Sequence, residues 1–222
     1  MTMSPEAMNP TMTSPPPALG TLLKTTTAAL HRRVERSVFL SSLLRGQLDR
    51  ASYLLLLHNL HALYAALEDA LAAHAGTPSV GPVAMPELFR RQALAADLQA
   101  LGAGAPPPLA RATQKYVQRL GEIRTAKPAL LVAHAYVRYL GDLNGGQALR
   151  RVVARNLGLV GDTCTRFYDF GDGATRQRLE LAFRAGLESA AAHQPDLQAL
   201  ADEALDAFER HEQLFEELSA SC

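Results

Sequence analysis

Three glycines stand in a stretch that otherwise favours helix, the segment from Leu140 to Gln147 (LGDLNGGQ). A glycine in a helix interior costs about 0.5–1 kcal/mol relative to alanine, so the segment gives up stability for its missing Cβ atoms. Two explanations remain open: a neighbouring helix packs closely on the glycines, or a flat ligand lies directly on the backbone. The polar residues Asp142 and Asn144 among the glycines favour the ligand, because a buried carboxylate needs partners.

His31 is the second candidate, and the helical spacing of Thr27 and Val34 places it on the apolar side of an expected helix. Glu35 follows one turn later, where a carboxylate can orient an imidazole that ligates a metal. A lone histidine on a helix is more often a core or surface residue, but neutral histidine is also a standard axial ligand of haem (heme) iron. A histidine helix and a glycine helix together predict a sandwich for a planar metal macrocycle. Lys24, two turns before His31, has the reach to meet a carboxylate at the rim.

Helices must position these residues, since no segment alternates with the two-residue period of a strand. We expect an all-α fold, a single domain of about seven helices over residues 19–222. Residues 1–18, rich in proline, serine and threonine, are expected to form a disordered leader. The apolar spacing predicts helices over residues 19–39, 49–74, 86–99, 109–120, 128–156, 175–192 and 196–218.

Composition excludes several classes of protein. The chain has 222 residues with 22 lysines and arginines against 22 aspartates and glutamates, so no overall field attracts nucleic acid. No apolar run approaches the roughly 20 residues that span a bilayer. Cys164 and Cys222 are too few for a disulfide scaffold, so we expect a cytoplasmic protein. We also expect a monomer. The glycine segment lacks the strand and the Lys-Ser/Thr ending of a phosphate loop, and no paired Glu-x-x-His motifs support a di-iron bundle.

Residues 133–147, AHAYVRYLGDLNGGQ, resemble the distal-helix signature of the haem oxygenases. Residues 23–31, LKTTTAALH, are similar to the beginning of the family's proximal helix. Residues 167–170 (FYDF) and 213–218 (QLFEEL) fall where the family has similar segments, so the resemblance runs in order from about residue 19 to 219. It implies the all-α haem oxygenase fold and a member of the soluble bacterial type.

The resemblance implies roles for residues on both faces of the haem. His31 is expected to be the proximal iron ligand, and Glu35 matches the glutamate that orients it. On the distal side, Gly141 and Gly145 match the glycines that let the helix backbone approach the haem. Asp142 matches the aspartate that orders water near the iron.

Further matches lie around the edge of the haem. Lys24, Tyr136 and Arg184 are expected to face the propionates, and Arg138 is expected to join the distal hydrogen-bond network. The plainer alternatives are that Tyr136 fills the core and that Arg138 is a surface charge. Phe208 either forms part of the wall at the haem edge or is an ordinary core phenylalanine.

The chain departs from the family pattern at three places. His61 is expected where the family has a tyrosine that joins the distal water network. Glu180 replaces one member of a basic pair whose other member is Arg184, and Ala28 stands in place of a basic residue on the proximal helix. Fewer propionate anchors leave the attacked meso carbon less determined, and the α carbon is the default expectation.

The activity implied is oxidative cleavage of haem b, which is substrate and cofactor at once, to biliverdin, CO and ferrous iron. It consumes O2 and electrons from a ferredoxin or a flavoprotein reductase. One rival is a non-catalytic haem-binding or storage protein, which has no need of Asp142 beside Gly141 and Gly145. Another is a structural bundle in which the glycines serve helix packing and His31 is incidental.

Overall fold

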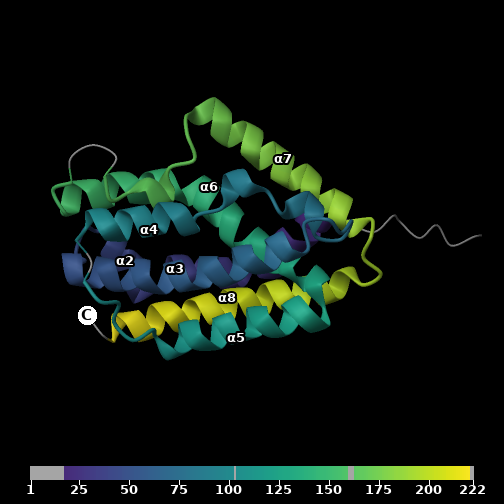
Figure 1. Ribbon diagram of the computed structural model, residues 1–222, viewed down its shortest axis with the longest axis horizontal. Helices are drawn as coiled ribbons and strands as arrows, with labels where there is room; N and C mark the ends of the chain where they lie inside the picture. Colours follow the sequence, from purple (N-terminus) through teal and green to yellow (C-terminus); the bar gives the residue numbers. More distant parts are fainter. Residues whose placement is uncertain (1–17, 103, 160–162, 221–222) are drawn as a thin grey trace, which may run out of the picture.

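The computed structural model of the chain describes residues 18–102, 104–159 and 163–220. Within these residues the secondary structure is helical and contains no strand, so the predicted all-α fold is confirmed (Figure 1). The leader predicted for residues 1–18 lies outside the described part apart from Ala18, and so does Cys222. The eight α-helices are α1 (Leu19–Glu35), α2 (Val38–Leu44), α3 (Arg50–Ala73), α4 (Arg91–Ala100), α5 (Arg111–Ala126), α6 (Leu131–Asn156), α7 (Gly173–Ala191) and α8 (Leu197–Ser219).

Side-chain caps set where several helices begin. The Asp49 carboxylate accepts a hydrogen bond from the backbone N–H of Ser52 at the start of α3 (2.7 Å). Asp172 and Asp196 cap α7 and α8 in the same way, at 2.8 and 3.0 Å. A helix leaves its first N–H groups without backbone partners, and such side chains satisfy them.

Several helix boundaries differ from the sequence prediction; for example, the helix expected over residues 109–120 continues to Ala126 as α5. The helix expected over residues 19–39 is two helices, because the Ser37 hydroxyl accepts from the Leu40 N–H (3.3 Å) and starts α2 anew. The helix expected from Pro86 begins instead at Arg91, since Pro86–Leu88 forms a separate 3₁₀ turn. The structure therefore has one more helix than the approximate number predicted.

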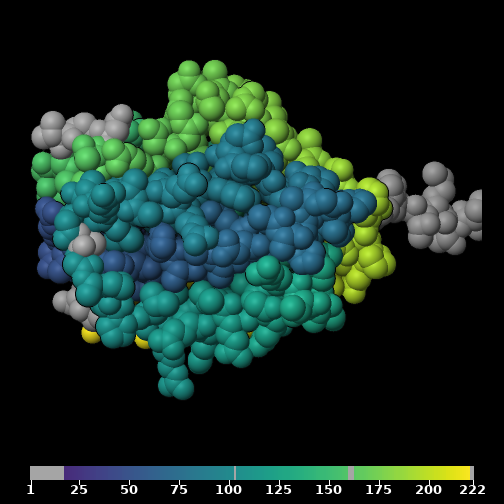
Figure 2. All heavy atoms as spheres, in the orientation of Figure 1, coloured from purple at the N-terminus to yellow at the C-terminus, as the bar shows by residue number. Residues whose placement is uncertain are grey.

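Helix α8 lies at the centre of the packing, in contact with α1, α2, α5 and α6. Helix α3 packs against α4, α5 and α6, and α3 and α4 cover the middle of the face seen in Figure 2, between α7 and α5. The buried apolar side chains of these elements form one core. Helix α1 packs mainly on α8, and it faces α6 across the cavity described below. Within the described residues, no helix is both long and apolar enough to cross a membrane.

Helix α7 meets the 3₁₀ turn Gly81–Val83 at one close point. A Cβ atom built on Gly186 would lie 2.2 Å from the carbonyl oxygen of Pro82. Real Cβ atoms do not approach so closely in a packed interior, so only glycine fits there unless the turn moves. This contact seats α7 just after Arg184, which lines the cavity.

Candidate active site

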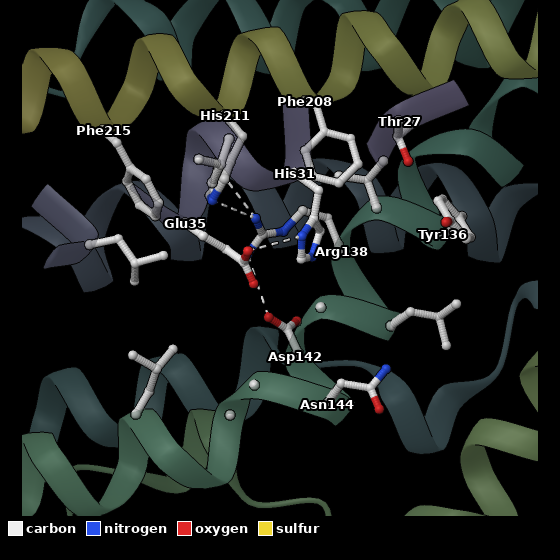
Figure 3. A pocket seen from close by; sticks show the side chains of 18 of the residues that line it. Thr27, His31, Glu35, Tyr136, Arg138, Asp142, Asn144, Phe208, His211 and Phe215 are labelled. Carbon is white, nitrogen blue, oxygen red and sulfur yellow. Dashed lines mark hydrogen bonds and ion pairs between the residues drawn. The ribbon is translucent and has the colours of Figure 1, made fainter. Parts of the chain in front are cut away.

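One cavity of about 580 Å³ lies among α1, α6 and α8, with α2 and α3 closing its apolar end (Figure 3). Its volume is in the range of small-molecule and cofactor sites. Ten residues predicted from the sequence for the two haem faces and the haem edge line this cavity: Lys24, His31, Glu35, Tyr136, Arg138, Gly141, Asp142, Gly145, Arg184 and Phe208. Residues more than a hundred positions apart in the chain thus meet around one space.

The glycines of α6 divide into two kinds. Cβ atoms built on Gly141 and Gly145 would have no atom within 4 Å, so no neighbouring helix packs on them. A Cβ on Gly146 would lie 3.5 Å from the carbonyl oxygen of Tyr168, so this glycine does pack against the 3₁₀ turn Arg166–Tyr168. Of the two explanations for the glycine segment, packing therefore applies to Gly146 only. Gly141 and Gly145 leave bare helix backbone on the cavity wall, which suits a flat ligand.

His31 enters the cavity from α1 (Figure 3). Its Nδ1 atom lies 3.5 Å from the Glu35 carboxylate one turn later. The ring meets Phe208 of α8 edge to face, with centroids 5.8 Å apart. The His31 side chain is 52% exposed, so its packing leaves the imidazole accessible from the cavity. An imidazole oriented through one nitrogen has the other available for a metal, as in known histidine sites.

On the α6 wall, Asp142 belongs to a buried polar group. The Tyr64 hydroxyl of α3 donates a short hydrogen bond to Asp142 Oδ2. Arg138 donates to the same hydroxyl from Nε and Nη2, at 3.0 and 2.9 Å, and its Nη2 lies 3.6 Å from Asp142 Oδ1. Burial raises the pKa of Asp142, while the charge of Arg138 and the Tyr64 hydrogen bond act to lower it. The carboxyl is therefore held firmly, with a raised pKa, at the wall of the cavity.

Comparison with known proteins shows the family of this chain. The family model described as Heme oxygenase matches residues 18–217. The heme oxygenase of the alga Porphyra purpurea is 34% identical over 210 residues, which cover 92% of this chain and 88% of that protein. The chain belongs to the heme oxygenase family. The family predicted from residues 133–147 is thereby confirmed. The predicted function, heme oxygenase, and the predicted enzyme class, oxidoreductase, are confirmed with it.

Solved structures of heme oxygenases share the fold closely. Heme oxygenase-1 of the cyanobacterium Synechocystis sp. PCC 6803, in complex with heme, superposes with a TM-score of 0.82 at 31% identity, covering 92% of this chain and 93% of that one. Heme oxygenase-2 of the same organism, in complex with heme and NO, gives a TM-score of 0.87 at 30% identity, covering 92% and 86%.

Cationic side chains mark one side of this heme oxygenase cavity. Lys24 of α1 and Arg184 of α7 line this side, and Arg32 lines the cavity two turns further along α1. Arg184 is held by Glu180, to which its Nε and Nη2 donate at 2.9 and 2.7 Å. This ion pair within α7 partly neutralises the charge that Arg184 brings to the cavity. Tyr136 stands on the same side, and burial raises the pKa of its hydroxyl.

One expectation about the distal network was wrong. His61 was expected to stand in the place of the family tyrosine, but it does not line the cavity. Tyr64, three residues later on α3, supplies the hydroxyl that bonds Asp142. The reason is helical geometry: Leu56, Leu60 and Tyr64 are spaced by one turn and share the face toward α6, and His61 is rotated off that face. Burial lowers the pKa of His61, as does the charge of Arg91.

Sequence reasoning also missed His211, which lines the cavity from α8. Its spacing was a usable signal, because His211 lies three residues after Phe208 and four before Phe215, on the apolar face of the helix. We name Arg138, Tyr64, Asp142 and His211 the cavity cluster, since the Arg138 Nη1 atom lies 3.0 Å from a ring nitrogen of His211.

A second buried polar group lies one turn earlier on α6, away from the cavity. His134 Nε2 lies 2.9 Å from the Glu203 carboxylate of α8, and its Nδ1 lies 3.0 Å from the Tyr116 hydroxyl of α5. Arg119 of α5 donates to the same carboxylate from Nε (3.0 Å). Burial acts to raise the pKa of Glu203, but the hydrogen bonds from His134 and Arg119 outweigh it and lower the pKa to about 2. We name these four residues the rear cluster.

Proposed function

We propose that this heme oxygenase binds haem b as its substrate between α1 and α6, with His31 as the axial ligand of the iron. The open space over Gly141 and Gly145 carries the proposal, because two glycines one turn apart with no atom near their Cβ positions offer a flat, bare backbone surface. Glu35, 3.5 Å from His31 Nδ1, would orient the imidazole and leave Nε2 available to ligate the iron. Bound haem supplies the iron that activates O2 and the meso edge that is oxidised.

The residues of α6 then manage protons near that edge. Asp142, with its raised pKa, holds a proton or a water molecule at the cavity wall, and Tyr64 and Arg138 fix the carboxyl in place. Gly141 and Gly145 keep the wall close to the haem face. The products are biliverdin, CO and ferrous iron, and attack at the α-meso carbon is the expected regiochemistry.

The cationic side of the cavity receives the propionates. Lys24, Tyr136 and Arg184 are the proposed contacts, since an ammonium, a phenol and a guanidinium all donate to carboxylates. Phe208 packs on the haem edge next to His31. Electrons come from a ferredoxin or a flavoprotein reductase, and the co-substrate is O2. The cytoplasmic location and the monomeric state stay predictions.

The main alternative is a protein that binds haem without degrading it. Binding needs an axial ligand and propionate contacts. It does not need a buried carboxyl, held by a tyrosine and an arginine, on the wall across the cavity from His31. The cavity cluster therefore favours the enzyme.

Adding equimolar haemin to the protein, followed by ascorbate under air, tests the proposal. We expect a Soret band that decays into bilin absorbance with release of CO. The His31→Ala variant should lose the sharp Soret band, and His193→Ala, an exposed histidine just after α7, should behave as the unmodified protein. A Soret band that persists would instead establish a haem carrier, and no Soret band would refute haem binding.

A further inference from the structure

His211 is a buried histidine that none of the proposed steps uses. Its side chain comes from α8, the residue is 8% exposed, and the ring lies 4.3 Å from that of Phe215. Both ring nitrogens lie close to Arg138 Nη1, at 3.0 and 3.1 Å (Figure 3). His211 thus lies in the cavity wall and contacts Arg138, which is next to the Asp142 carboxyl.

The chemistry of Arg138 and His211 determines which of the two donates the hydrogen bond. A guanidinium only donates hydrogen bonds, so the ring nitrogen that receives Nη1 must be unprotonated. His211 is therefore a neutral imidazole while Arg138 faces it. Burial and the charge of Arg138 both lower the pKa of His211 well below its ordinary value, in agreement with this geometry.

Arg138 in turn divides its donors between two helices. Nη1 points to His211 on α8, whereas Nε and Nη2 reach the Tyr64 hydroxyl on α3. Arg138 is 7% exposed, so without an acceptor on α8 one of its donors would be buried unpaired. A long side chain that loses one of its two anchors also regains rotamer freedom.

We propose that His211 is a positioning residue that holds the Arg138 guanidinium against the Tyr64–Asp142 pair, and so fixes the hydrogen bonding of the cavity cluster. The importance of this positioning for haem degradation rests on the proposed function of Asp142. The positioning itself is a property of the polypeptide and can be measured without haem.

The test compares His211→Leu, which removes the acceptor, with His211→Asn and His211→Gln, which place an amide oxygen near the positions of the two ring nitrogens. In the protein labelled with ¹⁵N-arginine, exchange of the Arg138 Nε–H with solvent reports how firmly the guanidinium is held. We expect at least about tenfold faster exchange in the leucine variant, and slow exchange in at least one of the amide variants.

If the Arg138 Nε–H exchanges at the same rate in His211→Leu as in the unmodified protein, the proposal is overturned. Fast exchange in both folded amide variants would also overturn it. If the leucine variant does not fold, the two amide variants decide alone, slow exchange in either supporting the proposal. In the haemin complexes, we further expect the pH midpoint of the visible-spectrum transition to move by about half a unit or more in the leucine variant. Failure of haemin to bind would refute the proposed function, and the exchange result on Arg138 would stand apart from it.

Discussion

Two buried clusters on α6 are built from the same residue types and have opposite properties. The cavity cluster and the rear cluster each contain an arginine, a histidine, a tyrosine and a carboxylic acid. Arg138 of the first and His134 of the second are one turn apart on α6. In the rear cluster, hydrogen bonds from His134 and Arg119 lower the pKa of Glu203 to about 2 against the burial that raises it. In the cavity cluster, burial prevails and raises the pKa of Asp142.

The difference lies in where the arginine directs its donors. Arg119 donates to Glu203 from Nε at 3.0 Å, and so stabilises the ionised form directly. Arg138 makes its hydrogen bonds to Tyr64 and His211, and its nearest approach to the Asp142 carboxylate is 3.6 Å. The rear cluster is therefore an ion pair that ties α5, α6 and α8 together. The cavity cluster holds a carboxyl in place without fully compensating its charge, which suits proton handling.

Removing the rear carboxylate should have the largest effect. Glu203→Ala leaves His134 and Arg119 without their acceptor in a buried site, and we expect the free energy of unfolding to fall by about 3–5 kcal/mol. Urea denaturation measures this. The matched control is Glu122→Ala, which removes an exposed carboxylate 3.7 Å from the same arginine and should change stability by less than about 0.5 kcal/mol. Equal effects of the two variants would contradict a structural role for the rear cluster.

Acid should weaken the rear cluster in a defined window. The folded-state pKa of Glu203 is about 2 against an ordinary 4.5, so its ionised form stabilises the fold above pH 4.5 by about 3 kcal/mol. This contribution is lost as the pH falls from 4.5 toward 2. The stability difference between the unmodified protein and Glu203→Gln should therefore shrink over that range and vanish below it. A stability difference that does not change with pH would show that His134 and Arg119 do not lower the pKa of Glu203.

The cavity carboxyl should matter for turnover and not for folding. Asp142→Asn keeps the shape but removes the titrating group, and we expect biliverdin formation to slow by about 100-fold, with haemin still bound. Because burial raises the pKa of Asp142, its ionisation costs stability at neutral pH, so the variant should be at least as stable as the unmodified protein at pH 7. Undiminished turnover would remove Asp142 from the mechanism.

The smallest expected effect concerns the glycines that make the cavity wall flat. Gly145→Ala adds a methyl group where the structure leaves open space, and we expect haemin affinity to fall about tenfold from the resulting overpacking. Gly121→Ala on α5 is the matched control, because its Cβ also meets no atom but does not line the cavity. Both variants should gain helix stability, by about 0.5–1 kcal/mol. Haemin titration with thermal unfolding separates the two outcomes.

The helices were largely predictable because the signals are local. Apolar spacing and acidic caps such as Asp49 and Asp196 lie within a few residues of the ends they determine. The break between α1 and α2 escaped, since Val34 and Val38 continue the one-turn spacing across the Ser37 cap. The family motif likewise lies on one helix, so its residues could be assigned to one cavity from the sequence.

Residues from other helices were harder to predict. Whether α3 turns Tyr64 or His61 toward α6 depends on the rotation of one packed helix against another. Residues three apart differ in direction by only about 60°, so a small rotation decides between them. His211 shares this difficulty, because its acceptor role exists only once α8 lies against Arg138. Partners within one helix follow from spacing, whereas partners across helices follow from packing.

The close point between Gly186 and Pro82 has a consequence for how this protein tolerates variation. Any side chain at position 186 must lift α7 off the turn, and Arg184 lies on that helix two residues earlier. In a scan of every substitution for haem degradation, position 186 should be as intolerant as a residue that touches haem. A substitution there would act by displacing Arg184 in the cavity, and not by removing a contact of residue 186 with the ligand. A map of intolerant positions would therefore include Gly186. This residue lies outside the cavity but would be mistaken for part of the active site.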